Sequence, residues 1–160
     1  MQCNYWAYDR GTKMKKIFIF SIVIFLFAGC ENYYLPSADK ARETASAFMT
    51  KYYVDMEFDA ATELGSGTFQ QSVNTAAMVK DMTLFYKKYG KMQGFNAEAY
   101  LLENNGKTCV VFYKAICENE MIYNKIVLSG DAKIGYKVEA AFAQDTPFKE
   151  YKDPVKFKGE

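Results

Sequence analysis

The spacing of apolar residues changes at Gly90, and this change limits the chain to a small set of folds. Between residues 38 and 89, apolar side chains recur every three or four positions, which is the period of an amphipathic α-helix. Between residues 94 and 143 they largely alternate with polar side chains, which is the period of a half-buried β-strand. Helices grouped before strands predict an α+β domain rather than a series of βαβ units.

The helical part divides into three predicted helices. They cover residues 38–54, residues 55–64, and a stretch that ends at Gly90. Asp55 would stand at the start of the second helix, where an acid caps the helix and meets its dipole. Asn74 or Thr75 can cap the third helix, and glycine favours the conformation that ends a helix at Gly90.

Four strands are predicted after Gly90. They cover residues 94–103, 107–116, 121–129 and 133–143. Asn105-Gly106 lies between the first two and indicates a hairpin, because both residue types accept a positive φ. We expect a curled four-strand antiparallel sheet with the helices packed on its inner face. Residues 144–160 contain two prolines, four lysines and four acids, and we expect a loose tail there.

An apolar run near the N-terminus is too short to cross a membrane as a plain helix. Residues 17–28 carry no charge, follow Lys15-Lys16 and precede Gly29-Cys30. A membrane-spanning helix needs about 20 apolar residues. A short basic segment, an apolar run and small residues before a cleavage site form the layout of a secretory signal peptide.

The end of this run, Phe27-Ala28-Gly29-Cys30, resembles a bacterial lipobox, with Phe27 where leucine is usual. The resemblance implies cleavage between Gly29 and Cys30 and a diacylglyceryl group on the Cys30 thiol. Glu31 follows the cysteine, and in Gram-negative lipoproteins the lack of an Asp there favours the outer membrane, facing the periplasm. An uncleaved N-terminal anchor is the alternative.

These signals divide the chain into five predicted parts. Residues 1–13 put polar and aromatic residues ahead of the lysine pair, so we interpret them as a mis-annotated start before Met14. The other parts are a signal peptide over 14–29, a lipidated cysteine and tether over 30–37, an α+β domain over 38–143, and the tail over 144–160.

The composition excludes several functional classes. The chain has no histidine, which excludes Ser-His-Asp and Cys-His catalysis as well as His-ligated zinc. Lys plus Arg is 20 and Asp plus Glu is 19, so no basic excess favours nucleic acid.

Cys109 and Cys117 would lie about 26 Å apart on one strand, at about 3.3 Å per residue. Disulfide geometry cannot span that distance, so we expect separate buried thiols, and no metal or cofactor.

Three further stretches carry a resemblance to a known fold family. They are the acidic joint over residues 55–61, the Phe-centred link over 67–73, and the run Ile134-Gly135-Tyr136-Lys137-Val138, with Tyr136 where relatives often have Trp. Together with the element order they resemble the nuclear-transport-factor-2-like (cystatin-like α+β) superfamily, and more narrowly uncharacterised bacterial lipoproteins with such a domain. The resemblance implies a cone that encloses an apolar pocket. Members include isomerases, cyclases and dehydratases beside plain binding and scaffold domains, so the fold does not choose a function.

Aromatic residues are the candidates to line such a pocket, although residues of this kind also fill protein cores. The candidates are Phe48, Tyr52, Phe85, Tyr86, Tyr89, Phe112, Tyr113 and Tyr123. An isomerase-like site would need a carboxylate in an apolar cavity beside a tyrosine donor. Asp55 and Asp81, with Tyr52 or Tyr113, are the candidates, and capping or surface positions are the simpler interpretation for both acids.

We therefore expect an exported, membrane-tethered lipoprotein whose domain is a non-catalytic binding or accessory module of the cell envelope. It would contact the membrane through its lipid anchor and bind a small apolar ligand or an envelope protein, but no nucleic acid. The alternatives are an isomerase- or cyclase-like enzyme and an assembly subunit of an envelope secretion or conjugation complex. The oligomeric state stays open, with a dimer through the sheet as one arrangement.

Overall fold

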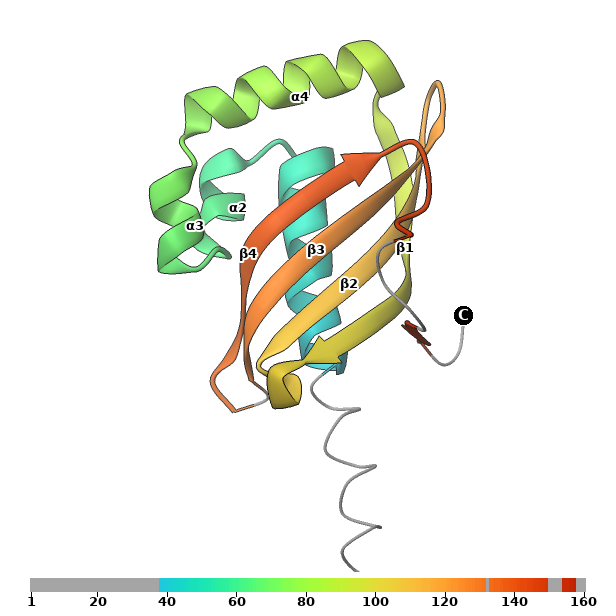
Figure 1. Cartoon of the computed structure of the whole chain (residues 1–160). Helices are drawn as coiled ribbons and strands as arrows, with labels where there is room; N and C mark the ends of the chain where they lie inside the picture. The colour runs from blue at the N-terminus through green and yellow to red at the C-terminus, as the bar shows by residue number, and fades with distance from the viewer. Residues whose placement is uncertain (1–37, 132, 150–153, 158–160) are drawn as a thin grey trace, which may run out of the picture. The chain divides into compact units, whose positions relative to one another are not determined.

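The domain is α+β, with its helices first and an open antiparallel sheet after them (Figure 1). This computed structural model describes residues 38–131, 133–149 and 154–157. The sheet has five strands in the order β4-β3-β2-β1-β5. The predicted fold class is confirmed at this level. The predicted number of four strands is wrong, because the segment after β4 supplies a fifth.

The helices follow the predicted pattern, with differences at their ends. Residues 38–49 are α-helical and continue into a π-helical turn. The labelled helical elements are η1 (Thr50–Val54), α2 (Phe58–Glu63), α3 (Gly67–Ser72) and α4 (Thr75–Tyr89). The stretch expected as a Phe-centred link thus contains the short helix α3, whose first turn is capped by Ser66 accepting a hydrogen bond from Phe69 N at 3.2 Å.

Helix α4 begins and ends where local chemistry predicts. Asn74 is the N-cap, and its side-chain oxygen accepts a hydrogen bond from Ala77 N at 2.8 Å. Gly90 ends the helix with a φ of 76°, a conformation that a residue with a Cβ adopts only under strain. The predicted capping role of Asp55 is wrong: α2 begins at Phe58 with Glu57 as its N-cap, and Asp55 follows the end of η1.

The strands form a continuous meander with one short addition. Their bounds are β1 (Met92–Glu103), β2 (Thr108–Cys117), β3 (Met121–Asp131), β4 (Gly135–Gln144) and β5 (Val155–Lys156). The predicted hairpin between β1 and β2 is confirmed. Its turn, η2 (Asn104–Gly106), places three successive residues at positive φ, which is why asparagine and glycine are needed there.

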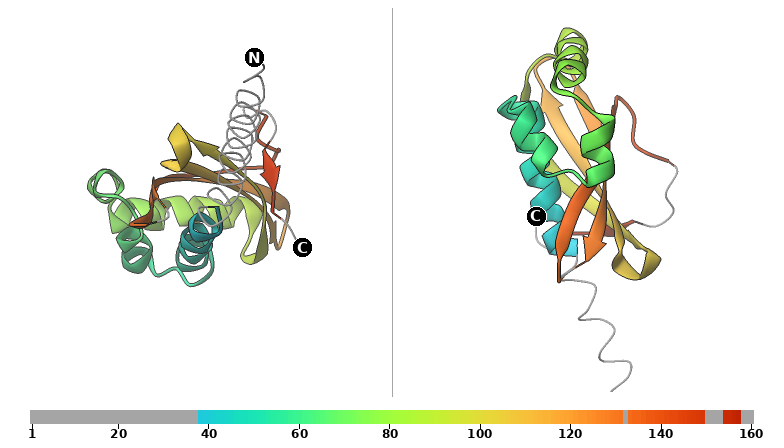
Figure 2. Two further views of the ribbon diagram at one scale, coloured as in Figure 1. Left: turned by 90° about the horizontal axis from the view of Figure 1, so that it is seen from below. Right: turned by 90° about the vertical axis from the view of Figure 1, so that its left-hand side faces the viewer.

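The helical segments that precede β1 lie on one face of the sheet, called here the inner face (Figure 2). The largest fully buried side chains include Tyr113, Phe48, Met49, Ile122 and Ile126. The hydroxyl of Tyr113 joins the sheet to the first helix, since it lies 2.9 Å from Ser46 Oγ and donates to Arg42 O at 3.3 Å. The core therefore lies between the helices and the inner face, as the hydrophobic period predicts.

The segment after β4 packs against the sheet, so the expectation of a loose tail is wrong for its described residues. Phe148 lies over the opposite, outer face, with its ring centroid 6.3 Å from that of Phe112. Farther along, the ring of Phe157 lies 4.8 Å from that of Tyr100, beside the pairing of β5 with β1. Two aromatic anchors thus hold a segment whose prolines and charges indicate an unstructured end.

The two described cysteines are separate thiols, as expected. Cys109 and Cys117 lie near opposite ends of β2, and both are free and buried. Burial raises the pKa of the Cys109 thiol to about 12 and that of the Cys117 thiol to about 11. Both thiols are therefore protonated at neutral pH, which makes them poor nucleophiles.

Within the described residues, none of the helices has the length and apolarity to cross a membrane.

Candidate functional site

The outer face of the sheet carries a row of residues that runs across the whole sheet. Strand register makes Ala99, Phe112, Lys125 and Phe142 neighbours on β1, β2, β3 and β4 in turn. Lys156 of β5 pairs with Ala99 and extends the row. Because side chains alternate between the faces of a strand, this row faces away from the helices.

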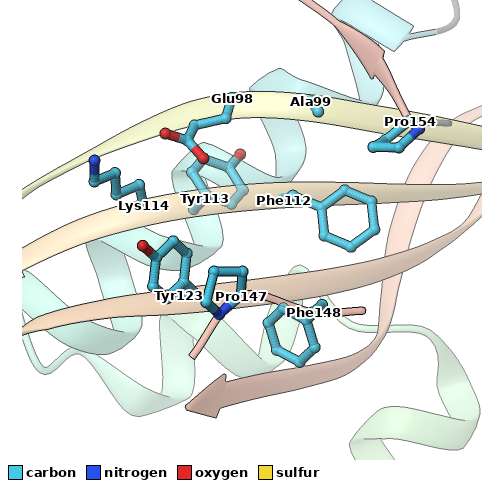
Figure 3. A pocket seen from close by; sticks show the side chains of 9 residues that line it. All are labelled: Glu98, Ala99, Phe112, Tyr113, Lys114, Tyr123, Pro147, Phe148 and Pro154. Carbon is cyan, nitrogen blue, oxygen red and sulfur yellow. The ribbon is translucent and has the colours of Figure 1, made fainter. Parts of the chain in front are cut away.

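A hollow of about 320 Å³ lies over this row (Figure 3). It is lined by Glu98, Ala99, Phe112, Tyr113, Lys114, Tyr123, Pro147, Phe148 and Pro154. The floor comes from β1, β2 and β3, and the wall from the segment after β4. Aromatic and proline side chains with a few polar groups are typical of sites for apolar ligands or partner side chains.

A buried lysine fixes one wall of this hollow. Lys125 is only 7% exposed, and its Nζ lies 4.9 Å from the ring centroid of Phe148 and 4.6 Å from that of Phe142. An ammonium held this close to aromatic faces gains a cation–π attraction, which is larger away from water. Lys125 therefore holds the Phe148 ring against the sheet, next to Phe112.

Glu98 connects the hollow to two others along β1. The pairing of β1 with β2 shifts between Ala97 and Ala99, so Glu98 is the extra residue of a β-bulge. A second hollow, of about 440 Å³, lies between β1 and the β5 segment, and a third, of about 490 Å³, extends toward Ile116 and Met121. Glu98 lines all three. The bulge thus places one carboxylate in the middle of a mainly apolar surface.

The apolar surface extends beyond the hollows. Three large side chains of the outer face are exposed: Ile116 by 58%, Phe142 by 47% and Met121 by 43%. Ile116 and Met121 pair across β2 and β3, so they form one patch at the end of the sheet near the β2–β3 turn. Lys114 lies between this patch and the first hollow, since it lines both hollows on that side.

Three of the eight predicted aromatic residues border the first hollow: Phe112, Tyr113 and Tyr123. Of these, Tyr113 belongs to the inner face, where its hydroxyl meets the first helix. The other five belong to the core or pack against it: Phe48, Tyr52, Phe85, Tyr86 and Tyr89. The first and third hollows lie on the outer face and the second lies at the β1 edge of the sheet, whereas the family resemblance implies a pocket between helices and sheet.

The five inner aromatics form a connected set of ring contacts. Phe48 stacks on Tyr52 with centroids 5.5 Å apart, and Phe85 lies 5.1 Å from Tyr89. Tyr53, which the prediction missed, joins the two groups, with centroids 4.7 Å from Tyr52 and 5.1 Å from Phe85. These contacts are those of a packed core, in which tilted and edge-to-face pairs add to the burial energy.

The two candidate catalytic acids do not form an isomerase-like site. Asp55 and Asp81 are both exposed. Asp55 pairs with Lys51, whose Nζ lies 3.2 Å from Asp55 Oδ2. Burial, and after it the negative charge of Asp81, raises the pKa of Tyr52 to about 12. A carboxylate that water reaches freely lacks the apolar surroundings that would make it a base near neutral pH.

Sequence reasoning missed Glu98, Pro147, Phe148 and Pro154. The only sequence signal at the last three is an aromatic residue between prolines in a segment without a regular period.

Among the described residues, no group of three or more His, Cys, Asp or Glu could hold a metal ion. The predicted cleavage and lipidation positions, Gly29 and Cys30, lie outside the described residues, as do the predicted parts over residues 1–37.

No protein-family model matches the chain, and no curated protein and no solved structure matches it either. The functional proposal therefore depends on the N-terminal sequence signals and on the outer face of the sheet.

Proposed function

We propose that the chain is an exported lipoprotein, tethered to a membrane by a diacylglyceryl group on Cys30. Its α+β domain then acts as a non-catalytic binding module of the cell envelope. The basic pair Lys15-Lys16, the apolar run over residues 17–28 and the small residues before Cys30 support this address. Two acyl chains on Cys30 would anchor the protein stably. In a cell with two membranes, the proposed place is the outer membrane, on its periplasmic side.

The observation that carries the binding role is the aromatic hollow on the outer face. Phe112, Tyr123 and Phe148 offer ring surfaces there, and the hollow is open to solvent beside them. A surface of this kind lowers its free energy when an apolar group covers it, by about 25 cal/mol for each Å² removed from water. A small apolar ligand or the side chain of an envelope protein has that chemistry.

We also propose that the domain has the cystatin-like, nuclear-transport-factor-2-like fold. Helices that precede an antiparallel meander, and that cover one face of it, support this proposal. Family members differ widely in function, so the fold adds nothing to the choice between ligand and partner.

The address is tested by native mass spectrometry of the full-length chain, extracted from membranes in mild detergent. We expect a polypeptide that begins at Cys30 and carries diacylglycerol. The variant Cys30→Ser should lose the lipid and the membrane retention. An unlipidated chain that still contains its N-terminal residues would contradict the proposal and leave a short N-terminal anchor.

The binding role is tested in the same spectra by a matched pair of half-buried tyrosines. We expect wild-type protein to retain a bound molecule. The variant Tyr123→Ala removes a ring that lines the hollow, and it should lose that molecule. Tyr86→Ala removes a ring that packs against the core instead, and it should retain it. Equal retention by both variants would argue against the outer hollow as the binding site.

An assembly subunit of an envelope complex is the second candidate, and one specific observation favours it. The exposed pair Ile116 and Met121 extends the apolar surface past the hollow. Exposed apolar patches of this kind mark interaction sites with other proteins. A bound polypeptide in the mass spectra, lost when both residues are changed to Glu, would select this function over small-molecule binding.

A further inference from the structure

The β3–β4 turn presents one apolar side chain almost completely to solvent. Ile134 is 85% exposed, the largest value among the exposed large apolar residues in the described part of the chain. It lies in the turn between Asp131 and Gly135, where polar residues and glycine are the common choice. No core contact explains an isoleucine at this position.

The turn holds Ile134 in place. Asp131 Oδ1 accepts hydrogen bonds from Lys133 N at 2.7 Å and from Ile134 N at 2.9 Å. The neighbouring η2 turn braces it, because Tyr136 donates its hydroxyl hydrogen to Gly106 O at 2.6 Å. Tyr136 is itself buried. These hydrogen bonds therefore join the two turns at one end of the domain, where Ile134 is exposed.

Two lysines accompany the exposed isoleucine. Lys133 precedes it in the turn, and Lys107 follows η2, with its carbonyl accepting a hydrogen bond from Gly130 N at 3.0 Å. Asp131 is engaged by two backbone N–H groups, and Glu103 at the end of β1 is another acid of this region. An exposed apolar side chain in a region that also carries lysines suits the boundary between lipid headgroups and acyl chains, where the ammonium groups meet phosphates.

This end of the domain is also the end from which the chain would run to its lipid. In Figure 1 and in the right view of Figure 2, the first helical segment (residues 38–49, cyan) begins at the same end of the domain as the β3–β4 turn and η2. From Cys30 to Ala38 there are eight residue steps. At about 3.5 Å each they span at most about 28 Å. A lipid on Cys30 would therefore keep these turns at a high effective concentration at the bilayer surface.

We propose that the end of the domain formed by the β3–β4 turn and η2 docks on a phospholipid bilayer, with Ile134 inserted at the headgroup boundary. This inference rests on the lipid anchor of the proposed function. In an antiparallel meander the β2–β3 turn lies at the other end of the strands, so Ile116 and Met121 would point away from the membrane. The outer face then stands clear of the bilayer and is open to its partner.

The test uses tryptophan fluorescence of the full-length chain in vesicles of phosphatidylethanolamine and phosphatidylglycerol. Trp6, the only native tryptophan, precedes the proposed cleavage site and is changed to Phe, so that an uncleaved chain carries no second tryptophan. Ile134→Trp is compared with Met121→Trp, which is also exposed but lies at the β2–β3 turn. We expect a blue shift of emission and strong quenching by brominated acyl chains at position 134, and neither at position 121.

The mass of the reconstituted protein separates the two ways in which this can fail. Lipidated Cys30 with no quenching at position 134, or with equal quenching at both positions, overturns the docking inference while the lipoprotein proposal stands. A chain without diacylglycerol, and without quenching, overturns both. Lys133→Glu in the Ile134→Trp protein should lower the quenching in anionic vesicles. Unchanged quenching in these vesicles would show that the lysines do not contribute to docking.

Discussion

Asn124 is a buried polar residue whose replacement should stabilise the protein. It lies on the inner face of β3 between Ile122 and Ile126, and its side chain is fully buried. Neither its Oδ1 nor its Nδ2 has a hydrogen-bond partner among the described residues. The Tyr53 hydroxyl lies near the amide: burial raises the pKa of Tyr53, and a hydrogen-bond-like interaction with the Asn124 side chain opposes that rise. The amide is thus close to this hydroxyl but outside normal hydrogen-bond geometry.

The expected size of the effect follows from the cost of burying an unpaired polar group. Each such group costs about 1–3 kcal/mol. The variant Asn124→Val removes both polar atoms and supplies a residue that favours strands. Its side chain is one bond shorter, so part of the gain is lost to the space left behind, which costs about 0.5–1.5 kcal/mol for a change of this size. We therefore expect the free energy of unfolding to rise by about 1 kcal/mol.

Urea unfolding followed by far-UV circular dichroism measures this change as a shift of the midpoint at constant slope. The matched control is Ile122→Val on the same face of the same strand, which should lower stability by about 0.5–1.5 kcal/mol. Tyr53→Phe reports separately on the neighbouring hydroxyl. The reasoning is refuted if Asn124→Val loses more than about 1 kcal/mol while Ile122→Val behaves as expected, because Asn124 would then have partners in solution.

Three further predictions concern the backbone, the thiols and the wall of the hollow. Gly90→Ala should lower the unfolding free energy by more than about 1 kcal/mol, measured by the same assay, because φ is +76° and the new Cβ would lie 2.7 Å from Glu118 Cβ. Burial raises the pKa of Cys109 from 9.0 to about 12, so the unfolded state ionises first and stability should fall as the pH rises from about 9 to about 12. Urea midpoints are measured over this pH range in wild type and in Cys109→Ala, and an equal fall in both proteins would contradict the assignment to Cys109. A double-mutant cycle of Lys125→Met with Phe148→Leu should show a coupling free energy of about 1 kcal/mol in the stability of the protein. A coupling near zero would show that the cation–π contact does not contribute to stability.

The regular part of the fold is predictable because each element repeats one simple pattern. Helix α4 has an apolar stripe between two recognisable ends, and the β1–β2 hairpin has asparagine and glycine where positive φ is needed. The fifth strand was missed because two residues cannot show a period of two. Asp55 was misplaced because the second helix does not follow the first directly: Met56 has a φ of 58°, and α2 begins only at Phe58.

The candidate site is less predictable, because it depends on which face of the sheet each aromatic residue meets. Phe112 and Tyr113 are adjacent in sequence, and both were candidates for a pocket. The register of β2 sends one to the outer hollow and the other to the core. Glu98 lines the site because of a β-bulge, and no glycine or proline marks the position of this bulge in the sequence. A shift of one residue at that point would exchange the faces of the neighbouring side chains.

The outer hollow also depends on the described residues after β4. Among them, β5 pairs with β1 at two positions, and Phe148 lies on the sheet through its side chain. The main contacts over the hollow are those of Phe148 with Phe112 and Lys125. A segment with few backbone hydrogen bonds opens at a lower free energy than the sheet beneath it. An apolar molecule in the hollow would bury the same rings that hold the segment, so its binding and the ordering of the segment would stabilise each other. The wall of the site would then be completed by the molecule that occupies it.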